Sequence, residues 1–356
     1  ENSAFSIESQ NLDTKIEKSG YLRGNALATV VSKTDDLRAI NFNLFPKLRV
    51  QSVVDLDGKA LQFIQEDKDR DAEYWVILPK GLSKGEKFQI RTIYEGKEAV
   101  ENTGSGNYFP IAREDWYPNQ RFGMYSNYEM KFSVPKKLQV IGTGTKISEA
   151  VEGDQSVSVW KSDFPLAVAG FNLGDFKREE GQLEKSQYTI ESYANKEPPD
   201  MVKEILSATQ GGALTGGGFV EGFAMGTMNT TQMMKKPLAE AQLSTALYDS
   251  YFGPIPYKRL TMSQQTACTF GQSWPMLVYM PICSFFDSTV RHQLGFSEDR
   301  GYWKTVASHE VSHQWWGHTV GFNSYRDQWM SEGFAMFSAS LFVQVIQKNN
   351  SEFRKY

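Results

Sequence analysis

The sequence predicts a multidomain chain of β and α/β structure, in which an N-terminal antiparallel β-sandwich precedes an α+β domain. Two observations predict this fold class. Short runs with strand periodicity fill the chain up to about residue 196, and runs with helical periodicity dominate after it. With 356 residues, the chain is long enough for two domains that each bury a core. We therefore place the first domain at residues 1–196 and the second at 197–356.

Alternation with a period of two marks the strands of the first domain, because every second side chain of a half-buried strand faces the core. Turn sequences such as Asp57-Gly58 and Pro79-Lys80-Gly81 separate these runs. No helical pattern intervenes between them, which favours an antiparallel sandwich. The clearest predicted strands are residues 26–31, 40–45, 74–78, 88–94 and 188–193.

Helical periodicity marks the second domain, which follows the Pro-rich segment 196–200. A glycine-rich stretch at 211–234 interrupts it, and we expect a surface loop there, because glycine at this density resists both helix and strand. A phosphate-binding loop is the alternative, but no Gly-Lys-Ser or Gly-Lys-Thr sequence follows. The predicted helices are residues 201–209, 238–251, 297–316 and 327–347.

Composition excludes several classes of protein. The formal charge of −4 is spread along the chain, so the sequence has no basic footprint and we expect no nucleic-acid partner. No run approaches the roughly 18 apolar residues of a spanning helix, so we expect no transmembrane segment.

The two cysteines, Cys268 and Cys283, are too few for a disulfide framework. We expect them to be small buried thiols, with a single disulfide as the alternative. The chain begins with Glu1 and shows no charged-then-apolar leader. A processed mature chain and a trimmed chain would both begin in this way. Of the two locations, we favour a secreted or periplasmic one over a cytoplasmic one.

Two of the four histidines stand four positions apart, in the run His309-Glu310-Val311-Ser312-His313. Residues i and i+4 share one face of a helix, so both imidazoles can reach one metal ion. Glu310 is turned sideways from that face, where it can act beside the metal as general base and acid rather than ligate it. His318 lies beyond Gly317, out of register with the pair, and we do not expect it to be a ligand.

Glu332, in the next predicted helix, supplies a third ligand, and 18 residues separate it from His313. Two histidines and one glutamate with an open fourth position form the pattern of a catalytic zinc site. We therefore predict one Zn²⁺ per chain. The alternative makes His309 and His313 core residues and the two glutamates solvated helix charges.

These residues resemble the gluzincin zinc aminopeptidases, the family of aminopeptidase N. The likeness rests on the run from His309 to His318 and on the segment from Trp329 to Ala335, which contains Glu-Gly-Phe-Ala. The segments 164–176 and 251–257 are also similar to family segments. The resemblance implies a saddle-like N-terminal β-sandwich and a thermolysin-like α+β catalytic domain. It also implies hydrolysis of peptides by a metal-activated water, with Glu310 as the catalytic residue.

The family binds its substrate's free amine with the Glu of a Gly-Ala-Met-Glu-Asn strand. The matching strand here is Gly271-Gln272-Ser273-Trp274-Pro275, which has no carboxylate. The resemblance implies that the substrate binds along Gly271, Gln272 and Ser273, and we expect an aminopeptidase. A peptidase that cleaves internal bonds, or a zinc-holding scaffold or binding module without turnover, is the alternative. A nearby acid, Asp287, could replace the missing carboxylate.

Two further departures concern the end of the catalytic domain. Ser331 stands before the third ligand, where the family commonly has Asn. The family's transition-state tyrosine comes tens of residues after the third ligand, whereas this sequence ends at Tyr356. We therefore expect the helical half of the domain to be truncated here. We also expect the apolar face of the last helix to be covered by the C-terminal remainder of the protein or by self-association.

Overall fold

The computed structural model describes residues 3–70, 72–120, 124–183, 187–204, 234–286, 302–322 and 324–355. Within these ranges the chain forms two compact units. The first comprises residues 1–102, 110–171 and 322–327, and the second comprises 103–109, 172–321 and 328–356. Among the helices of the described residues, none combines the length and the apolar character that crossing a membrane requires.

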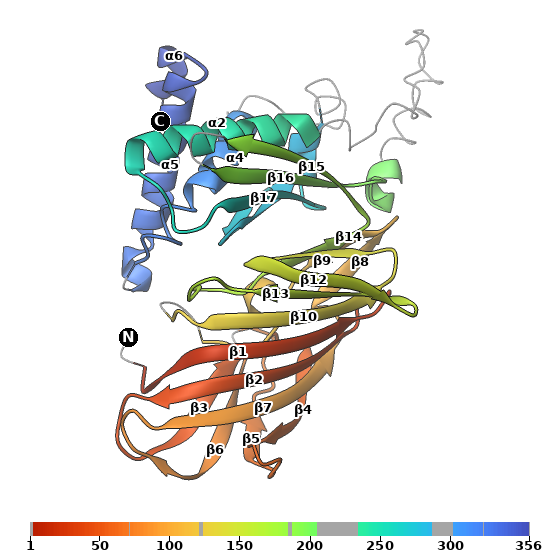
Figure 1. The fold of residues 1–356 in the computed structure, drawn as a ribbon, viewed down its shortest axis with the longest axis vertical. Coiled ribbons are helices and arrows are strands. Elements are labelled where there is room, and N and C mark those ends of the chain that lie inside the picture. The colour runs from red at the N-terminus through yellow and green to blue at the C-terminus, as the bar shows by residue number, and fades with distance from the viewer. Residues whose placement is uncertain are drawn as a thin grey trace. The chain divides into compact units, whose positions relative to one another are not determined.

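The first unit is built from β-sheets (Figure 1). Its seven-stranded sheet has the order β12-β13-β10-β1-β2-β7-β4, and a three-stranded sheet has the order β3-β6-β5. The bounds of these strands are β1 Phe5–Ile16, β2 Leu22–Ser32, β3 Leu37–Asn43, β4 Leu48–Val54, β5 Gln62–Gln65, β6 Glu73–Leu82, β7 Lys87–Gly96, β10 Asn127–Pro135, β12 Thr145–Glu152 and β13 Gln155–Lys161. Shorter elements are β8 Val100–Gly104, β11 Gln139–Gly142 and the 3₁₀ turns η1 Arg113–Asp115 and η6 Tyr325–Asp327.

Alternating burial confirms the strand periodicity of the sequence. In β2 every second residue from Leu22 to Ser32 is buried, whereas the residues between them are partly or fully exposed. Most pairs in the large sheet are antiparallel, as predicted, but β1 runs parallel to β10. Parallel pairing requires a long connection between the two strands, and the segment from β1 to β10, which contains β2 to β9, provides it.

The second unit holds a mixed five-stranded sheet covered by helices. The sheet order is β15-β16-β17-β19-β18, in which β16, β17 and β19 are parallel and the two edge strands are antiparallel to their neighbours. Helix α2 lies across β15 and β16, and α4 packs between α2 and α5 (Figure 1). The bounds are β9 Asn107–Pro110, β14 Phe171–Gly174, β15 Phe176–Leu183, β16 Tyr188–Asn195, α2 Lys235–Phe252, β17 Arg259–Gln265, β18 Gln272–Trp274, β19 Leu277–Pro281, η4 Ile282–Phe285, α4 Tyr302–Ser312, α5 Trp329–Val345 and α6 Asn350–Phe353.

A charged network ties together three strands of this sheet. Glu191 of β16 is buried and contacts Arg178 of β15 at 2.6 Å and Arg259 of β17 at 2.9 Å. The hydroxyl of Thr261 donates a further hydrogen bond to the same carboxylate. Burial alone would raise the pKa of Glu191, but these partners outweigh it and hold the pKa below its ordinary value.

The predicted fold class is therefore confirmed: sandwich-like sheets come first, and a mixed α+β unit with few helices follows. The division at residue 196 stays a prediction, because compact contact units and independently folding domains are different quantities. Most of the predicted helix at 201–209, the Gly-rich loop except Met234, and residues 297–301 lie outside the described residues.

Helix α5 carries large apolar side chains that are exposed in the described structure, among them Trp329, Phe334 and Phe337. The predicted covering of this face by a further segment or by a second copy stays a prediction.

Candidate metal and peptidase site

Three ligand atoms from two helices converge in the second unit. His309 lies in the last turn of α4, His313 follows the end of that helix directly, and Glu332 lies in the first turn of α5. The two Nε2 atoms are 3.2 Å apart. The Oε2 atom of Glu332 lies 3.3 Å from Nε2 of His309 and 3.6 Å from Nε2 of His313. These are the three residues that the sequence predicted would meet.

This geometry fits a zinc ion. Tetrahedral zinc with ligand bonds of about 2.0–2.2 Å holds neighbouring donor atoms roughly 3.3–3.6 Å apart. The three separations found here match the edges of one face of that tetrahedron. Two imidazoles and one carboxylate are also the donor set of catalytic zinc sites. Among the described residues, no other cluster of His, Cys, Asp or Glu has the spacing of a metal site.

The ring of His313 is held in one orientation from its far side. Its Nδ1 lies 3.0 Å from the carbonyl of Trp316 and 3.1 Å from the hydroxyl of Ser331. Because a carbonyl only accepts, Nδ1 carries the proton and the lone pair of Nε2 faces the metal position. Ser331, which stands where the family commonly has Asn, therefore supports a ligand of the site.

The sequence predicted that both histidines would lie within one helix, but α4 ends at Ser312. Gly317 has a φ of +106°, and the turn before it tightens through a hydrogen bond from the N–H of Gln314 to the carbonyl of Val311. The two imidazoles still meet, because His313 keeps its position one helical turn beyond His309.

Glu310 is buried beside the two histidines. Burial raises the pKa of its carboxyl, although the charges of His313 and His309 oppose the shift. The carboxylate lies directly against Gly271, where a Cβ atom would stand only 2.6 Å from Oε1. A side chain at position 271 would therefore displace Glu310 or the strand. Glu332 differs, because the nearby imidazoles of His309 and His313 lower the pKa of its carboxyl strongly.

Strand β18 runs beside these residues and is braced by Gln314. This side chain is fully buried and joins four groups. Its Nε2 donates to the hydroxyl of Ser273 at 2.6 Å and to the carbonyl of Trp274 at 3.0 Å. Its Oε1 accepts from the N–H of Met276 at 2.9 Å and from the hydroxyl of Tyr257. The residue after His313 thus fixes the strand that the sequence predicted would bind substrate.

His318 contacts the same strand. Its Nε2 donates to the carbonyl of Ser273 at 2.9 Å. Burial lowers the pKa of His318 to about 4, so the ring is neutral near pH 7. Among the described residues, the metal cluster consists of His309, His313 and Glu332 and does not include His318.

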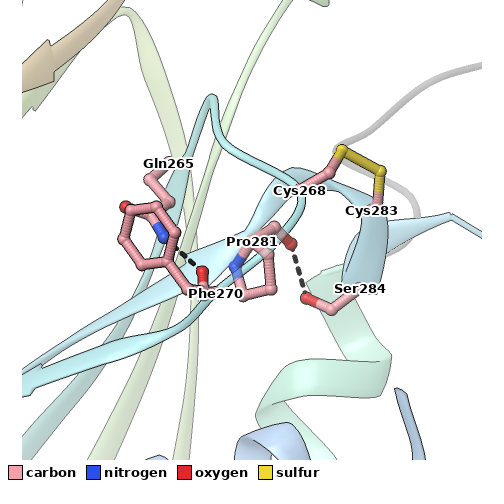
Figure 2. Close-up of a disulfide and its surroundings, with 6 residues drawn as sticks. All are labelled: Gln265, Cys268, Phe270, Pro281, Cys283 and Ser284. Carbon is pink, nitrogen blue, oxygen red and sulfur yellow. Dashed lines mark hydrogen bonds between the residues drawn. A yellow bond between two sulfur atoms is a disulfide. The ribbon is translucent and has the colours of Figure 1, made fainter. Parts of the chain in front are cut away.

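A disulfide between Cys268 and Cys283 closes the loop that leads into β18 (Figure 2). The expectation of two free thiols was therefore wrong. The pairing became possible because the loop after β17 returns beside η4, where the N–H of Ile282 donates to the carbonyl of Ala267. A hydrogen bond from Gln265 to the carbonyl of Phe270 also fixes this loop.

The structure thus brings together His309, Glu310, His313, Glu332 and the segment 271–273, whereas Asp287 and Tyr356 lie outside the described residues. Sequence reasoning missed the bracing roles of Gln314 and of His318. Their nearness to the zinc motif was a signal, but their contacts depend on how β18 folds back against the motif.

The fold and the donor set are those of a zinc metallopeptidase domain. Residues 228–356 match the model of the Peptidase family M1 domain. The resemblance to the gluzincin aminopeptidases is thereby confirmed, and zinc is the cofactor of this domain.

Individual relatives agree with this family. The chain is 31% identical over 101 residues to endoplasmic reticulum aminopeptidase 1 of Homo sapiens, which covers 28% of this chain and 10% of the relative. It is 26% identical over 102 residues to aminopeptidase N of Lactococcus lactis subsp. cremoris. This match covers 28% of this chain and 12% of the relative. The matched segments thus span only about a tenth of these curated relatives.

A solved structure extends the likeness to nearly the whole chain. The M1 zinc metallopeptidase of Deinococcus radiodurans has a TM-score of 0.68 at 18% sequence identity. The likeness covers 97% of this chain and 72% of that chain. At this identity the comparison establishes the fold.

Proposed function

We propose that the protein is a zinc-dependent aminopeptidase. The observation that carries this proposal is the convergence of His309, His313 and Glu332 at tetrahedral spacing, with the carboxylate of Glu310 buried beside them. A site that only stabilises the fold is usually closed by four protein ligands. In the part of the chain that the structure describes, three protein ligands meet, so the fourth position is available to water or substrate.

The residues of this chain divide the work of peptide hydrolysis. His309, His313 and Glu332 would hold the zinc ion, which when bound acidifies water and polarises a carbonyl. Glu310 takes a proton from the attacking water and passes it to the leaving amine. Its burial supports this role, because a raised pKa brings the carboxyl closer to the pH at which it must both accept and donate.

Substrate binding is proposed to occur along the edge of β18. A peptide in extended conformation adds to a sheet edge through main-chain hydrogen bonds. Gly271 stands at the start of this strand in contact with Glu310, so a peptide bond paired there lies next to the general base. The names of the relatives, which are aminopeptidases, favour removal of N-terminal residues over cleavage of internal bonds.

Two other functions are tested together with this one. Cleavage of internal bonds would follow if β18 accepted a peptide on both sides of Gly271. A zinc-holding module without turnover would follow from the missing amine-binding carboxylate. The buried Glu310 argues against such a module, because a purely structural zinc site has no use for that carboxylate.

The test uses zinc-loaded wild-type protein and the variant Glu310→Gln. Each is incubated with a matched pair of peptides, one with a free and one with an acetylated amino end. We expect wild type to release the first residue of the free peptide, and the variant to keep its zinc while losing about 10²- to 10⁴-fold in kcat. Equal turnover by the variant would show that Glu310 is not the base. Wild type that holds zinc but cleaves neither peptide would leave the binding module as the function.

We further propose a secreted or periplasmic location. The disulfide between Cys268 and Cys283 supports it, because disulfides persist mainly in oxidising compartments. Fractionation of the native cell, with quantitation of the reduced and oxidised protein, tests this proposal.

A further inference from the structure

The free edge of β18 offers main-chain groups only at alternate residues. Within the described part of the chain, β18 is the last strand of the sheet and pairs with β19 on one side. Trp274 lies opposite Leu277 across a two-residue turn. The closing pair of such a hairpin exchanges its own hydrogen bonds, so Gln272 and Trp274 direct their main-chain groups toward β19. The main-chain groups of Ser273 and Gly271 therefore point to the free edge, where a peptide would pair.

One of these two positions is already occupied. The carbonyl of Ser273 accepts a hydrogen bond from Nε2 of His318 at 2.9 Å. A carbonyl has no proton to give, so His318 must be the donor. The imidazole therefore stands where the N–H of a pairing peptide would have to lie. Gly271, two residues earlier, faces the carboxylate of Glu310 instead.

The occupied position is rigid. The hydroxyl of Ser273 is held by Gln314 at 2.6 Å, and the side chain of Ser273 is buried. The segment from Gly317 to Val320 is closed by two main-chain hydrogen bonds, Gly317 N–H to Val320 and Val320 N–H to Trp315. A movement of β18 away from His318, or of the segment that carries His318 away from β18, would break these hydrogen bonds.

We infer that His318 is a specificity-determining residue. By occupying the carbonyl of Ser273, it limits how many substrate residues on the amino side of the cleaved bond can pair with β18. The inference rests on the proposed function. A peptide that pairs antiparallel with β18, the more frequent arrangement of strands, runs from Gly271 toward Ser273 in its amino-terminal direction. Such a peptide meets His318 soon after the bond that lies beside Glu310. The site then accepts peptides with a free, short amino end and rejects those that continue.

The experiment compares wild type with His318→Ala and with the matched control Val320→Ala. Val320 lies in the same segment, and its side chain is 57% exposed. Each zinc-loaded protein is given the same peptide with a free and with an acetylated amino end, together with a longer peptide extended at that end. The measured quantity is the ratio of kcat/KM for the blocked or extended peptide to kcat/KM for the free peptide.

We expect His318→Ala to raise this ratio about tenfold, because the freed carbonyl of Ser273 regains one main-chain hydrogen bond with the longer peptide. Val320→Ala should leave the ratio unchanged. His318→Gln, which keeps an N–H donor on a long side chain, should restore the low ratio. A merely structural role of His318 would lower both kcat/KM values and leave their ratio as in wild type, and this result would overturn the inference.

A second measurement covers the case in which His318→Ala does not fold. A crystal structure of zinc-loaded Glu310→Gln with a bound tripeptide should show the amino end of the peptide stopping beside His318. A peptide that continues past Ser273 along β18 would overturn the inference. Failure of the proposed function looks different, because wild-type protein would then cleave none of the peptides.

Discussion

Substitution of Gly271 by Ala tests the contact between the edge strand and the general base. The added Cβ would lie 2.6 Å from Oε1, 2.7 Å from Cγ and 2.9 Å from Cδ of Glu310. Since Cβ atoms essentially never approach another atom closer than 3.0 Å, Glu310 or the strand must move by about 0.4 Å or more. Misplacement by about 1 Å can cost 10²-fold in rate, so we expect kcat to fall between about tenfold and a hundredfold.

The assay measures kcat on a free peptide at saturation, together with zinc content by mass spectrometry. Zinc should remain at one ion per chain, because the atoms nearest to the new methyl group all belong to Glu310, which is not a ligand. Gly333→Ala is the control, since its Cβ would meet only Trp329, at 3.7 Å, an ordinary contact. Full turnover by Gly271→Ala with zinc bound would refute the placement of Glu310 against this strand.

Two further substitutions test the support of the site. Gln314→Leu removes the acceptor of the buried Met276 N–H, at about 1–3 kcal/mol, whereas the Tyr257 hydroxyl keeps the main-chain carbonyl of residue 314 as an acceptor. We expect calorimetry to show a lower unfolding midpoint for this variant, and an unchanged midpoint would contradict the bracing role. Glu191→Gln should destabilise by about 3 kcal/mol at pH 7, because two arginines lose their buried counter-charge. The folded-state pKa of Glu191 is depressed, so this difference from wild type should be full above about pH 4.5 and shrink as the pH falls through the folded-state pKa; a constant difference down to pH 3 would contradict it.

The metal site could be predicted from the sequence because its chemistry is local. His309 and His313 are one helical turn apart, and a turn with a second helix suffices to return Glu332 to them. The predicted helices agree for the same reason: α2 and α5 begin and end within three residues of the predicted limits. Local periodicity determines such elements almost without reference to the rest of the chain.

Contacts between distant segments could not be predicted in this way. Nothing in the spacing of Gln314 says that its amide joins Trp274, Met276 and Tyr257, since these bonds depend on how the β18 hairpin folds against the turn after α4. The disulfide was misjudged for a related reason. Fifteen positions separate Cys268 and Cys283, and only the hairpin between them brings their Cα atoms to 5.1 Å.

Strand partners are equally hidden from the sequence. The predicted strand at 188–193 forms as β16, but it belongs to the sheet of the second unit rather than to the sandwich. Its alternation shows which residues are buried, and it does not show which neighbour buries them. The parallel pairing of β1 with β10 escaped prediction for the same reason.

Anomalous scattering at the zinc absorption edge, from crystals of the protein purified without added metal, tests the central claim most directly. We predict one peak per chain, about 2.0–2.2 Å from Nε2 of His309, Nε2 of His313 and a carboxylate oxygen of Glu332. A protein that shows no peak after incubation with stoichiometric zinc, or a peak held by other residues, would contradict the proposed zinc site and the mechanism built on it.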